Sequence, residues 1–456
     1  MQAVTLATRY LSTKHVYSMR TRISALVLVV VSSILAACGS EGRSRGPDAR
    51  VIALHAASSY PQIQFYREQR PQGGLEFGSG QSFLYEVGQY DFNLNITPPL
   101  SSASVRLKSF SVTLEQGTEY YFVISEVGGV LEPLVVTQAP FSLASANAEV
   151  SVFHAASASP TMDIYLTAPG AVLSAANPIG TAAFNQHVAP STFAPGDYQL
   201  AFTEAGNPLN VLFTSMAMTL LPGQANFLAI ADAGIDTNEL IVERITNVST
   251  VLVNVNAPAT QRIINGVTDA QPRDVFLDDD FSVPFLAAVP YGVPTARAPI
   301  ATGDRKISVT PAGNPGVIEV ETVDTLFAGN WHTALVAGDP GTLVLNNFAE
   351  NRRRIIGEAH LRYYNAAAQF VSIGIVISAP GGTALGFPVV LVNGGSAEDF
   401  PLLPGDYEIT VFPAGSTTAA LGPLPITVAG EGLYSMLFLN GPTVDTVSVV
   451  LFDDFP

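Results

Sequence analysis

The chain has 456 residues, of which 38 are acidic and 21 are Lys or Arg, and its net charge is −17. Such an excess of carboxylates repels a phosphate backbone, which excludes nucleic-acid binding as a main function. Hydrophobic residues make up 48% of the chain and charged residues 13%, a balance typical of folded domains rather than of disorder. With a single cysteine, no internal disulfide can form, so each domain must depend on hydrophobic burial.

An apolar stretch near the N-terminus has the order of parts found in an export signal. Arg20 and Arg22 precede an almost entirely apolar run over residues 23–35. This run is shorter than the about 20 residues that a membrane-spanning helix needs. The sequence therefore predicts a cleaved signal over residues 1–37, and Met19 offers an alternative start.

The only cysteine, Cys38, closes the sequence Leu-Ala-Ala-Cys, which resembles the bacterial lipobox. The resemblance implies cleavage before Cys38 and a lipid on its thiol; an unmodified thiol after an ordinary signal is the alternative. The removed segment holds four basic residues and no acid, so the mature chain has a net charge of −21 and needs its acyl chains to stay on an anionic membrane. Gly39 and Ser40 follow without an aspartate, which by resemblance to lipoprotein sorting implies the outer membrane if the cell is Gram-negative. Residues 38–48 are expected to form a lipidated stalk.

Three sequence marks recur in one order about every 100 residues, which predicts four homologous domains. The first mark is an apolar strand that ends in His or Asn before Ala, at His55, His154, Asn256 and Asn365. The second is a Gly turn into an alternating strand, at Gly88, Gly196, Gly303 and Gly405. The third is a Gly turn into an apolar strand, at Gly117, Gly223, Gly329 and Gly432.

Short β-rich segments between Gly and Pro turns, about seven in each repeat, predict an all-β chain of four tandem antiparallel, immunoglobulin-like β-sandwiches. The expected domains cover residues 49–144, 148–245, 249–348 and 358–456. A repeat of about 100 residues exceeds the period of solenoids and propeller blades, so each domain is expected to have its own core. Short joints between the domains predict a stiff rod of separate units.

The repeat resembles a bacterial extracellular family of unknown function whose members carry a His-Ala-Ser-Pro-Asp-Ala-Pro type motif before a Val-Asp-Val-Tyr strand. The second domain matches best, with His154-Ala-Ala-Ser-Ala-Ser-Pro160 and Met162-Asp163-Ile164-Tyr165. The first domain has Gln64 in place of the aspartate, and the last two domains have Asn in place of the histidine. The resemblance implies tandem β-sandwiches on secreted or surface proteins and no established activity.

Catalytic signatures such as a Gly-x-Ser-x-Gly elbow, a His-Glu-x-x-His pair or a Walker loop do not occur in the sequence. No catalytic residue and no cofactor is therefore predicted. His55 and His154 are expected to hold the corner after their strand through backbone hydrogen bonds, as Asn also can; a shared metal site is the alternative. Asp278, Asp279 and Asp280 are a candidate calcium site, but the run lacks the spacing of a calcium loop and favours a solvated hairpin tip, so no metal site is predicted.

Candidate ligand-binding residues lie on predicted loops of the rigid scaffold, where functional contacts concentrate. They are Trp331, the sole tryptophan, which follows a Gly turn, and Arg67 and Arg70 in a Gly- and Arg-bearing loop.

The sequence thus predicts an exported, lipid-anchored cell-envelope protein that acts as a scaffold or as an adhesion or binding module without catalysis. Its expected partners are the membrane, through the lipid on Cys38, and a polysaccharide or an envelope or surface protein. One alternative is a carbohydrate-binding surface lipoprotein, which requires exposed aromatic residues on one face, including Trp331. Another is a metal-dependent hydrolase, which requires acidic residues that converge in one cleft.

Overall fold

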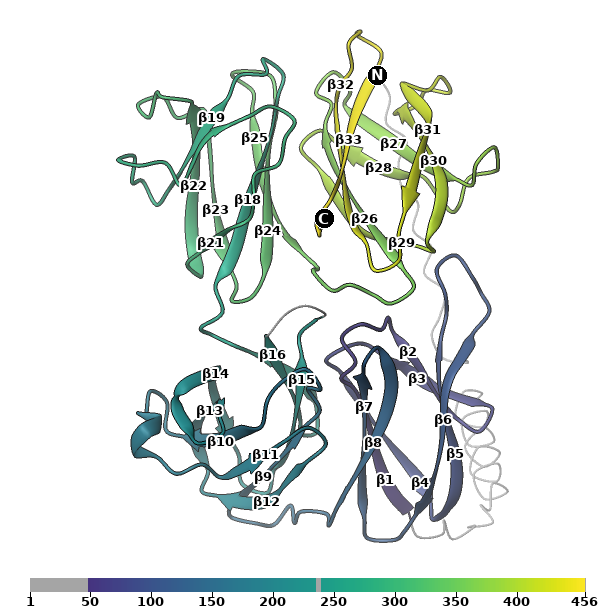
Figure 1. The fold of residues 1–456 in the computed structure, drawn as a ribbon, viewed down its shortest axis with the longest axis vertical. Helices are drawn as coiled ribbons and strands as arrows, with labels where there is room; N and C mark the ends of the chain where they lie inside the picture. The colour runs from purple at the N-terminus through teal and green to yellow at the C-terminus, as the bar shows by residue number, and fades with distance from the viewer. Residues whose placement is uncertain (1–47, 235–238, 456) are drawn as a thin grey trace, which may run out of the picture. The chain divides into compact units, whose positions relative to one another are not determined.

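The computed structural model of the protein describes residues 48–234 and 239–455. In this part of the chain there are 33 strands and one 3-10 helix, Leu173–Ala175 (Figure 1). Within the same residues, no helix is long and apolar enough to cross a membrane. The prediction of an all-β chain is confirmed. The strands form eight sheets that pair into four domains, each with a hydrophobic core between its two sheets.

The first domain pairs the sheets β4-β1-β7-β8 and β3-β2-β5-β6. Its strands are β1 (Asp48–His55), β2 (Ile63–Arg67), β3 (Arg70–Leu75), β4 (Gly80–Glu86), β5 (Gly88–Ile96), β6 (Val105–Leu114), β7 (Glu119–Val127) and β8 (Val130–Gln138). The second domain pairs the sheets β12-β9-β15-β16-β17 and β11-β10-β13-β14. Its strands are β9 (Ala148–His154), β10 (Met162–Thr167), β11 (Gly180–Ala182), β12 (His187–Phe193), β13 (Gly196–Glu204), β14 (Asn207–Leu220), β15 (Ala225–Asp232), β16 (Leu240–Ile245) and β17 (Ser249–Val253).

The third domain pairs the sheets β21-β18-β24-β25 and β20-β19-β22-β23. Its strands are β18 (Ala259–Val267), β19 (Arg273–Leu277), β20 (Leu286–Val289), β21 (Ala298–Ile300), β22 (Gly303–Pro311), β23 (Val320–Leu326), β24 (Trp331–Gly338) and β25 (Val344–Glu350). The fourth domain pairs the sheets β29-β26-β32-β33 and β28-β27-β30-β31. Its strands are β26 (Ala359–Ala366), β27 (Ser372–Ser378), β28 (Val389–Val392), β29 (Ser396–Leu402), β30 (Gly405–Pro413), β31 (Leu421–Val428), β32 (Leu433–Asn440) and β33 (Val447–Asp453).

One pair of neighbouring strands in each domain is parallel. These pairs are β1 with β7, β9 with β15, β18 with β24 and β26 with β32. The prediction of purely antiparallel sheets was therefore wrong, because alternation of apolar and polar residues reports which face is buried and not which way a strand runs. Each domain also has at least eight described strands rather than about seven.

The third domain begins later than its first sequence mark suggested. Strand β17 pairs with β16 and so extends a sheet of the second domain. The strand that runs parallel to β24 is β18, which places Asn265 opposite Val336 in the position that His55 has opposite Ile124. Asn256 was thus the wrong residue, because Gly266 replaces the alanine by which the mark was recognised.

Neighbouring domains share apolar cores, which corrects the expectation of units joined only by short linkers. Ile52 and Leu54 on β1 pack in one cluster with Phe153 on β9 and Phe227 on β15, between the first and second domains. An equivalent cluster joins β18 and β24 to β26 and β32, between the third and fourth domains. The first strand of each domain is therefore buried on both faces. This is why β1 and β9 are mostly apolar without alternation, whereas β18 and β26 also bury an arginine.

Candidate functional site

One side chain fixes the end of the first strand in each domain. Nδ1 of His55 accepts a hydrogen bond from the amide two residues later (3.3 Å), and its Nε2 lies 2.9 Å from the Pro61 carbonyl oxygen. Asn265 makes the same pair of contacts, since Oδ1 accepts from the amide two residues later (3.2 Å) and Nδ2 donates to the Gln271 carbonyl (2.9 Å). These contacts support the structural role expected from the sequence. Within the described residues, no group of three or more His, Cys, Asp or Glu is arranged to hold a metal ion.

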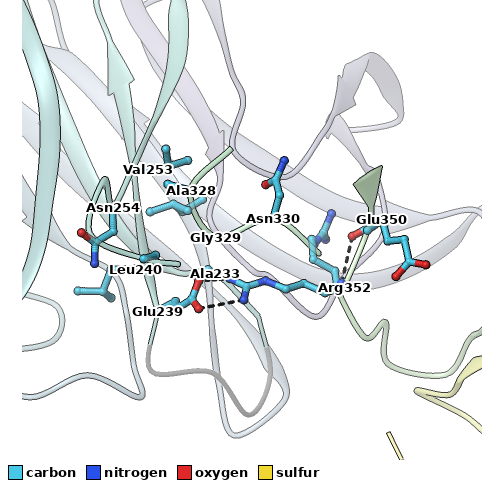
Figure 2. Close-up of a pocket in the computed structure, with 14 residues that line it drawn as sticks. Ala233, Glu239, Leu240, Val253, Asn254, Ala328, Gly329, Asn330, Glu350 and Arg352 are labelled. Atoms are coloured by element: carbon cyan, nitrogen blue, oxygen red, sulfur yellow. Dashed lines mark hydrogen bonds and ion pairs between the residues drawn. The ribbon is translucent and has the colours of Figure 1, made fainter. Parts of the chain in front are cut away.

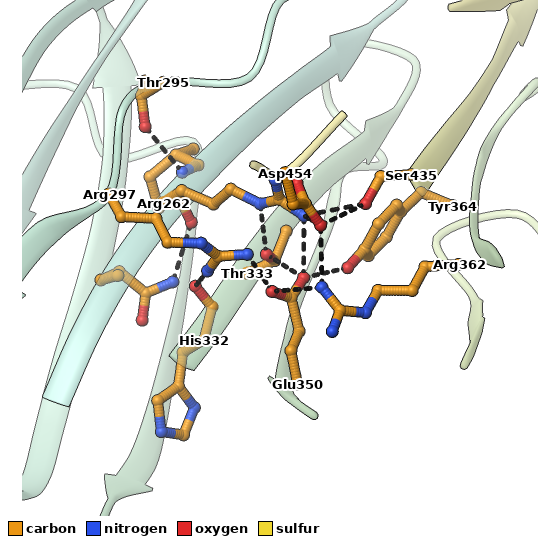
Figure 3. Close-up of polar contacts among 12 residues, drawn as sticks. Arg262, Thr295, Arg297, His332, Thr333, Glu350, Arg362, Tyr364, Ser435 and Asp454 are labelled. Carbon is orange, nitrogen blue, oxygen red and sulfur yellow. Dashed lines mark hydrogen bonds and ion pairs between the residues drawn. The ribbon is translucent and has the colours of Figure 1, made fainter. Parts of the chain in front are cut away.

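Buried charges gather where the third and fourth domains meet (Figure 3). Arg262 on β18 and Arg362 on β26 each contact both Glu350, the last residue of β25, and Asp454, which follows β33. The distance is 3.0 Å from Arg262 Nη2 to Glu350 Oε1 and 2.8 Å from Arg362 Nη1 to Asp454 Oδ2. Arg297 also pairs with Glu350. Both carboxylate side chains are 0% exposed, so this charge cluster is closed to solvent.

Hydroxyl groups complete the charge cluster. Thr333 and Tyr364 donate hydrogen bonds to Glu350, and Ser435 donates one to Asp454 (3.0 Å). Buried charges are tolerated only when they are paired and hydrogen-bonded in this way. The cluster therefore has no exposed group with which to bind a substrate, and its evident effect is to hold the two domains in one register.

The charges of the cluster determine the ionisation of Glu350. Burial by itself raises the pKa of this carboxyl group, but the guanidinium groups of Arg262, Arg362 and Arg297 outweigh burial and lower the pKa to about 2. Glu350 is therefore ionised across the physiological pH range. This cluster was not predicted from the sequence. Its signal is that Arg262 and Arg362 each stand three residues before the corner Asn of the first strand in the third and fourth domains.

A buried carboxyl group, Glu243, lies between the first and second domains. It stands on β16 between Ile241 and Ile245, which belong to the shared apolar core, and is 0% exposed. Among the described residues neither carboxyl oxygen has a hydrogen-bond partner, and the nearby Gly78 amide donates to the His55 carbonyl instead (2.9 Å). Burial raises the pKa of Glu243 well above its usual value, which favours the neutral form.

Two of the three candidate ligand-binding residues, Trp331 and Arg67, contact other side chains of the chain itself. The Trp331 ring stacks on Phe455 with centroids 5.0 Å apart, and the Arg297 guanidinium lies 4.2 Å from its centroid. The half-buried Trp331 is therefore not a free platform for a sugar ring. Arg67 lies 4.8 Å from the ring centroid of Tyr85, whereas Arg70 is exposed at the start of β3.

Two of the three carboxylates in the acidic run of the third domain pair with basic residues of the neighbouring strand β22. Asp278 contacts Arg305 (2.6 Å) and Asp279 contacts the amine of Lys306 (2.9 Å). Asp280 instead accepts hydrogen bonds from Ser282. The three carboxylates thus point to three different partners rather than to one centre, in agreement with a solvated tip.

A cavity of about 240 Å³ lies beside the joint that leads out of the third domain (Figure 2). An ion pair between Arg352 and Glu239 crosses it, with Nη1 3.0 Å from Oε1. Asn254, Gly329 and Asn330 line it further. The polar residues of the lining are three asparagines, two glutamates and two arginines. They include no Ser, Thr, Cys, Lys or His that could act as a nucleophile with an adjacent base. The lipidation candidate Cys38 lies outside the described residues.

Comparisons with known proteins identify the repeat but no function. The family model described as "Domain of unknown function (DUF4397)" matches residues 49–165 and 259–375, and no curated protein matches the chain. The Bacillus anthracis TIE protein is 11% identical with a TM-score of 0.16, over 83% of this chain and 66% of that chain. BcpA, the major pilin subunit of Bacillus cereus, is 10% identical with a TM-score of 0.14, over 87% of this chain and 99% of that one.

TM-scores at this level carry no argument about fold or function, and the chain spans just under two thirds of the TIE protein. The family match is different, because its two segments together cover more than half of the chain. Each segment begins with one domain, the first or the third, and ends within the second strand of the domain that shares its apolar core. The chain belongs to the DUF4397 family and carries two tandem copies of its domain.

Proposed function

We propose that this protein is a lipid-anchored scaffold of the cell envelope that binds another envelope component without catalysis. The observation that carries the proposal is the pairing of domains through buried surfaces. The shared apolar cores fix the first domain against the second and the third against the fourth, and the charge cluster at Glu350 adds to the latter contact. Rigidity of this kind presents surface loops at constant spacing, which is what a scaffold requires.

We further propose that the domains are immunoglobulin-like. Tyr90, Tyr198 and Tyr407 each donate a hydrogen bond from the side-chain hydroxyl to the carbonyl four residues earlier. This contact resembles the tyrosine corner of immunoglobulin-type sandwiches. Two packed sheets and a repeat of about 100 residues support the same conclusion.

The anchor is proposed to be a lipid on Cys38, in the outer membrane. The experiment is fractionation of cells grown with an alkyne-labelled fatty acid, comparing the wild type with Cys38→Ala and with the neighbouring control Ser40→Ala. We expect the wild type and Ser40→Ala in the outer-membrane fraction with label, and Cys38→Ala released without label. A labelled, membrane-bound Cys38→Ala would refute the anchor.

The carbohydrate-binding alternative is tested with the full mature chain carrying Cys38→Ser. Its binding to an array of bacterial and plant glycans is measured with calcium and with a chelator. We expect no saturable glycan binding, in accordance with the contacts that Phe455 and Arg297 make with the Trp331 ring. Saturable binding to one glycan class would replace the scaffold by the carbohydrate-binding alternative.

A further inference from the structure

Three of the four domains contain the same Ala-Gly turn between two strands of one sheet. The turns are Ala205-Gly206 after β13, Ala312-Gly313 after β22 and Ala414-Gly415 after β30. In each turn the glycine has a φ between 75° and 77°. The alanine amide donates to the carbonyl of Thr161, Pro272 or Ser372, respectively, over 3.0 to 3.1 Å. The backbone of the turn is therefore built alike in the second, third and fourth domains.

In two of these domains an aspartate carboxylate binds the glycine amide of the turn. Asp163 Oδ2 accepts from the Gly206 amide at 2.7 Å, and Asp274 Oδ2 accepts from the Gly313 amide at 2.8 Å. The second oxygen of Asp163 accepts from the Thr181 hydroxyl (2.5 Å), and that of Asp274 from a backbone amide of β20 (2.7 Å). Both aspartates are at most 8% exposed. The turn is thus a binding site for a carboxylate that the domain itself supplies.

In the fourth domain the position of this aspartate is taken by Gly374. The register establishes the equivalence, because Gly374 lies opposite Phe412 as Asp163 lies opposite Thr203 and Asp274 opposite Thr310. The Gly415 amide has no hydrogen-bond partner among the residues that the structure describes. Gly415 is exposed, so this amide is accessible to a ligand.

A cavity of about 540 Å³ lies at this place in the fourth domain and is lined by both Gly374 and Gly415. Its apolar wall includes Val376, Val390 and Phe412. The remaining lining residues are Pro388, Pro413, Ala414, Ser416 and Thr417, so no lining residue is charged. A mostly apolar cavity of this size with a few polar groups is typical of small-molecule sites.

The first domain shows that the fourth is a special case. It lacks the aspartate, with Gln64 at that position, but it also lacks the Ala-Gly turn, because Thr97 and Pro98 follow its strand. Proline has no amide to donate. The carboxylate and its donor are thus both present in two domains and both absent from one, whereas the fourth domain keeps the donor alone.

We propose that the cavity of the fourth domain binds a small carboxylate with an apolar body, such as an aryl- or alkyl-carboxylate. The ligand carboxylate accepts from the Gly415 amide, as Asp163 and Asp274 do from their turns, and the Thr417 hydroxyl is a second donor on the same wall. The apolar body covers Val376 and Val390, of which Val390 is 64% exposed, so binding removes apolar surface from water. This site is independent of the lipid anchor and of the proposed scaffold.

The test is isothermal titration of the full mature chain, carrying Cys38→Ser, with 3-phenylpropionate and with 3-phenylpropionamide, which has the same apolar body without the charge. We expect saturable binding of the carboxylate and at least about tenfold weaker binding of the amide, because hydrogen bonds to charged acceptors are the stronger kind. Equal binding of the two probes, or no binding of either, would overturn the proposal.

The decisive variant is Gly374→Asp, which restores the residue of the second and third domains. A Cβ at Gly374 meets no atom closer than the Phe412 carbonyl oxygen at 3.8 Å, so the fold accepts it. We expect this variant to lose binding of 3-phenylpropionate at least about tenfold while it keeps or raises its melting temperature. Gly316→Asp, at an exposed glycine of the third domain with comparable space, adds the same charge and is expected to bind like the parent.

Val390→Glu provides a second route to the same answer if Gly374→Asp does not fold. It places a carboxylate at an exposed position of the same cavity, and we expect it to weaken the probe by charge repulsion at least about tenfold. Unchanged affinity in a folded Gly374→Asp or Val390→Glu variant would show that the probe binds elsewhere and would refute the site.

Discussion

Arg262 and Arg362 occupy equivalent positions in the third and fourth domains, and each contacts the same two carboxylates, Glu350 and Asp454. The registers show the equivalence, because each arginine lies opposite the third residue of its parallel partner region, Thr333 or Ser435. The cluster is thus nearly symmetric between the two domains. Its charges depend on both domains together, since either one alone would bury an arginine without its full set of partners.

The corresponding positions between the first and second domains hold no charges. Ile52 and Ser151 stand in place of the arginines, and Gln138 stands in place of Glu350. There Ser151 donates to Gln138 (3.1 Å), and Tyr121 stacks on Phe227 with centroids 3.9 Å apart. A wrong pairing of the first domain with the fourth would bury an arginine against apolar groups, which is costly. The cluster therefore selects the native neighbour.

Removal of one carboxylate from the charge cluster should destabilise the third and fourth domains strongly. We expect Glu350→Ala to lower the free energy of unfolding by about 3–5 kcal/mol, because three buried guanidinium groups lose a shared partner. The measurement is urea unfolding followed by the fluorescence of Trp331, which lies in the third domain and contacts Phe455.

The control for Glu350→Ala is a combined variant in which the four charged residues are replaced by the uncharged residues at the equivalent positions of the first and second domains. It combines Arg262→Ile, Arg362→Ser, Glu350→Gln and Asp454→Asn. We expect the combined variant to be more stable than Glu350→Ala, because no guanidinium of the pair is left buried without an acceptor. A combined variant less stable than the single one would show that the cluster contributes net stability beyond satisfying its own charges.

Acid should weaken the same interface. The pKa of Glu350 is lowered from 4.5 to about 2 in the folded chain, so its contribution is complete above pH 4.5 and is lost as the pH falls towards 2. We expect a loss of about 3 kcal/mol by pH 2 from this group. The measurement is the difference in unfolding free energy between the wild type and the four-residue variant at each pH, and a difference that does not change between pH 5 and pH 2 would contradict it.

The sequence predicted the repeats and the all-β class because both are written in local patterns. Gly turns and apolar alternation mark strands wherever the domain lies in the chain. The corner role of His55 was also accessible, since Asn replaces it in other copies and makes the same two backbone contacts. In the third domain the sequence mark was assigned to Asn256 rather than to Asn265. The apolar strand β17, which belongs to a sheet of the second domain, precedes Asn256 and resembles the first strand of a domain.

Contacts between domains could not be predicted from the same patterns. A strand that is buried on both faces differs in sequence from one that is buried on a single face only because the residues of its outer face are less polar. These residues do not show which other domain packs against that face. The buried Arg262 and the missing carboxylate at Gly374 become informative only when the register is known, because each has meaning by comparison with the equivalent residue of another domain. The partners of Asp278 and Asp279 were likewise not predictable, since charge density in the sequence does not show that Arg305 and Lys306 pair with them.

Glu243 should reduce stability at neutral pH, and its removal should increase it. Its pKa is raised above 4.5 in the folded chain, so the folded state binds more protons than the unfolded state and stability falls as the pH rises above 4.5. We expect Glu243→Met, which is similar in size and apolar, to raise the free energy of unfolding by about 2 kcal/mol at pH 7. In the Glu243→Met variant, the part of the fall in stability between pH 5 and pH 8 that is due to Glu243 should be absent. The measurement is thermal and urea unfolding across this range, with Glu115→Met at an exposed turn of the first domain as the control.

The last prediction concerns His55, whose ring is fully buried. Burial first, and then the charge of Arg353, lower its pKa from 6.5 to about 3 against the effect of the hydrogen bond to the Pro61 carbonyl. As the pH falls, this histidine is protonated at a higher pH in the unfolded chain than in the folded chain. Its contribution to the free energy of unfolding is therefore complete above pH 6.5 and is lost as the pH falls towards 3. This loss amounts to about 4 kcal/mol by pH 3.

His55→Asn keeps one acceptor and one donor at the corner, as Asn265 does, and removes the titration. We therefore expect His55→Asn to be less sensitive to acid than the wild type. His55→Leu should be about 1–3 kcal/mol less stable than His55→Asn at every pH, because the amide of residue 57 is left without an acceptor. If His55→Asn and the wild type lose stability in parallel between pH 7 and pH 4, the acid sensitivity resides elsewhere in the chain.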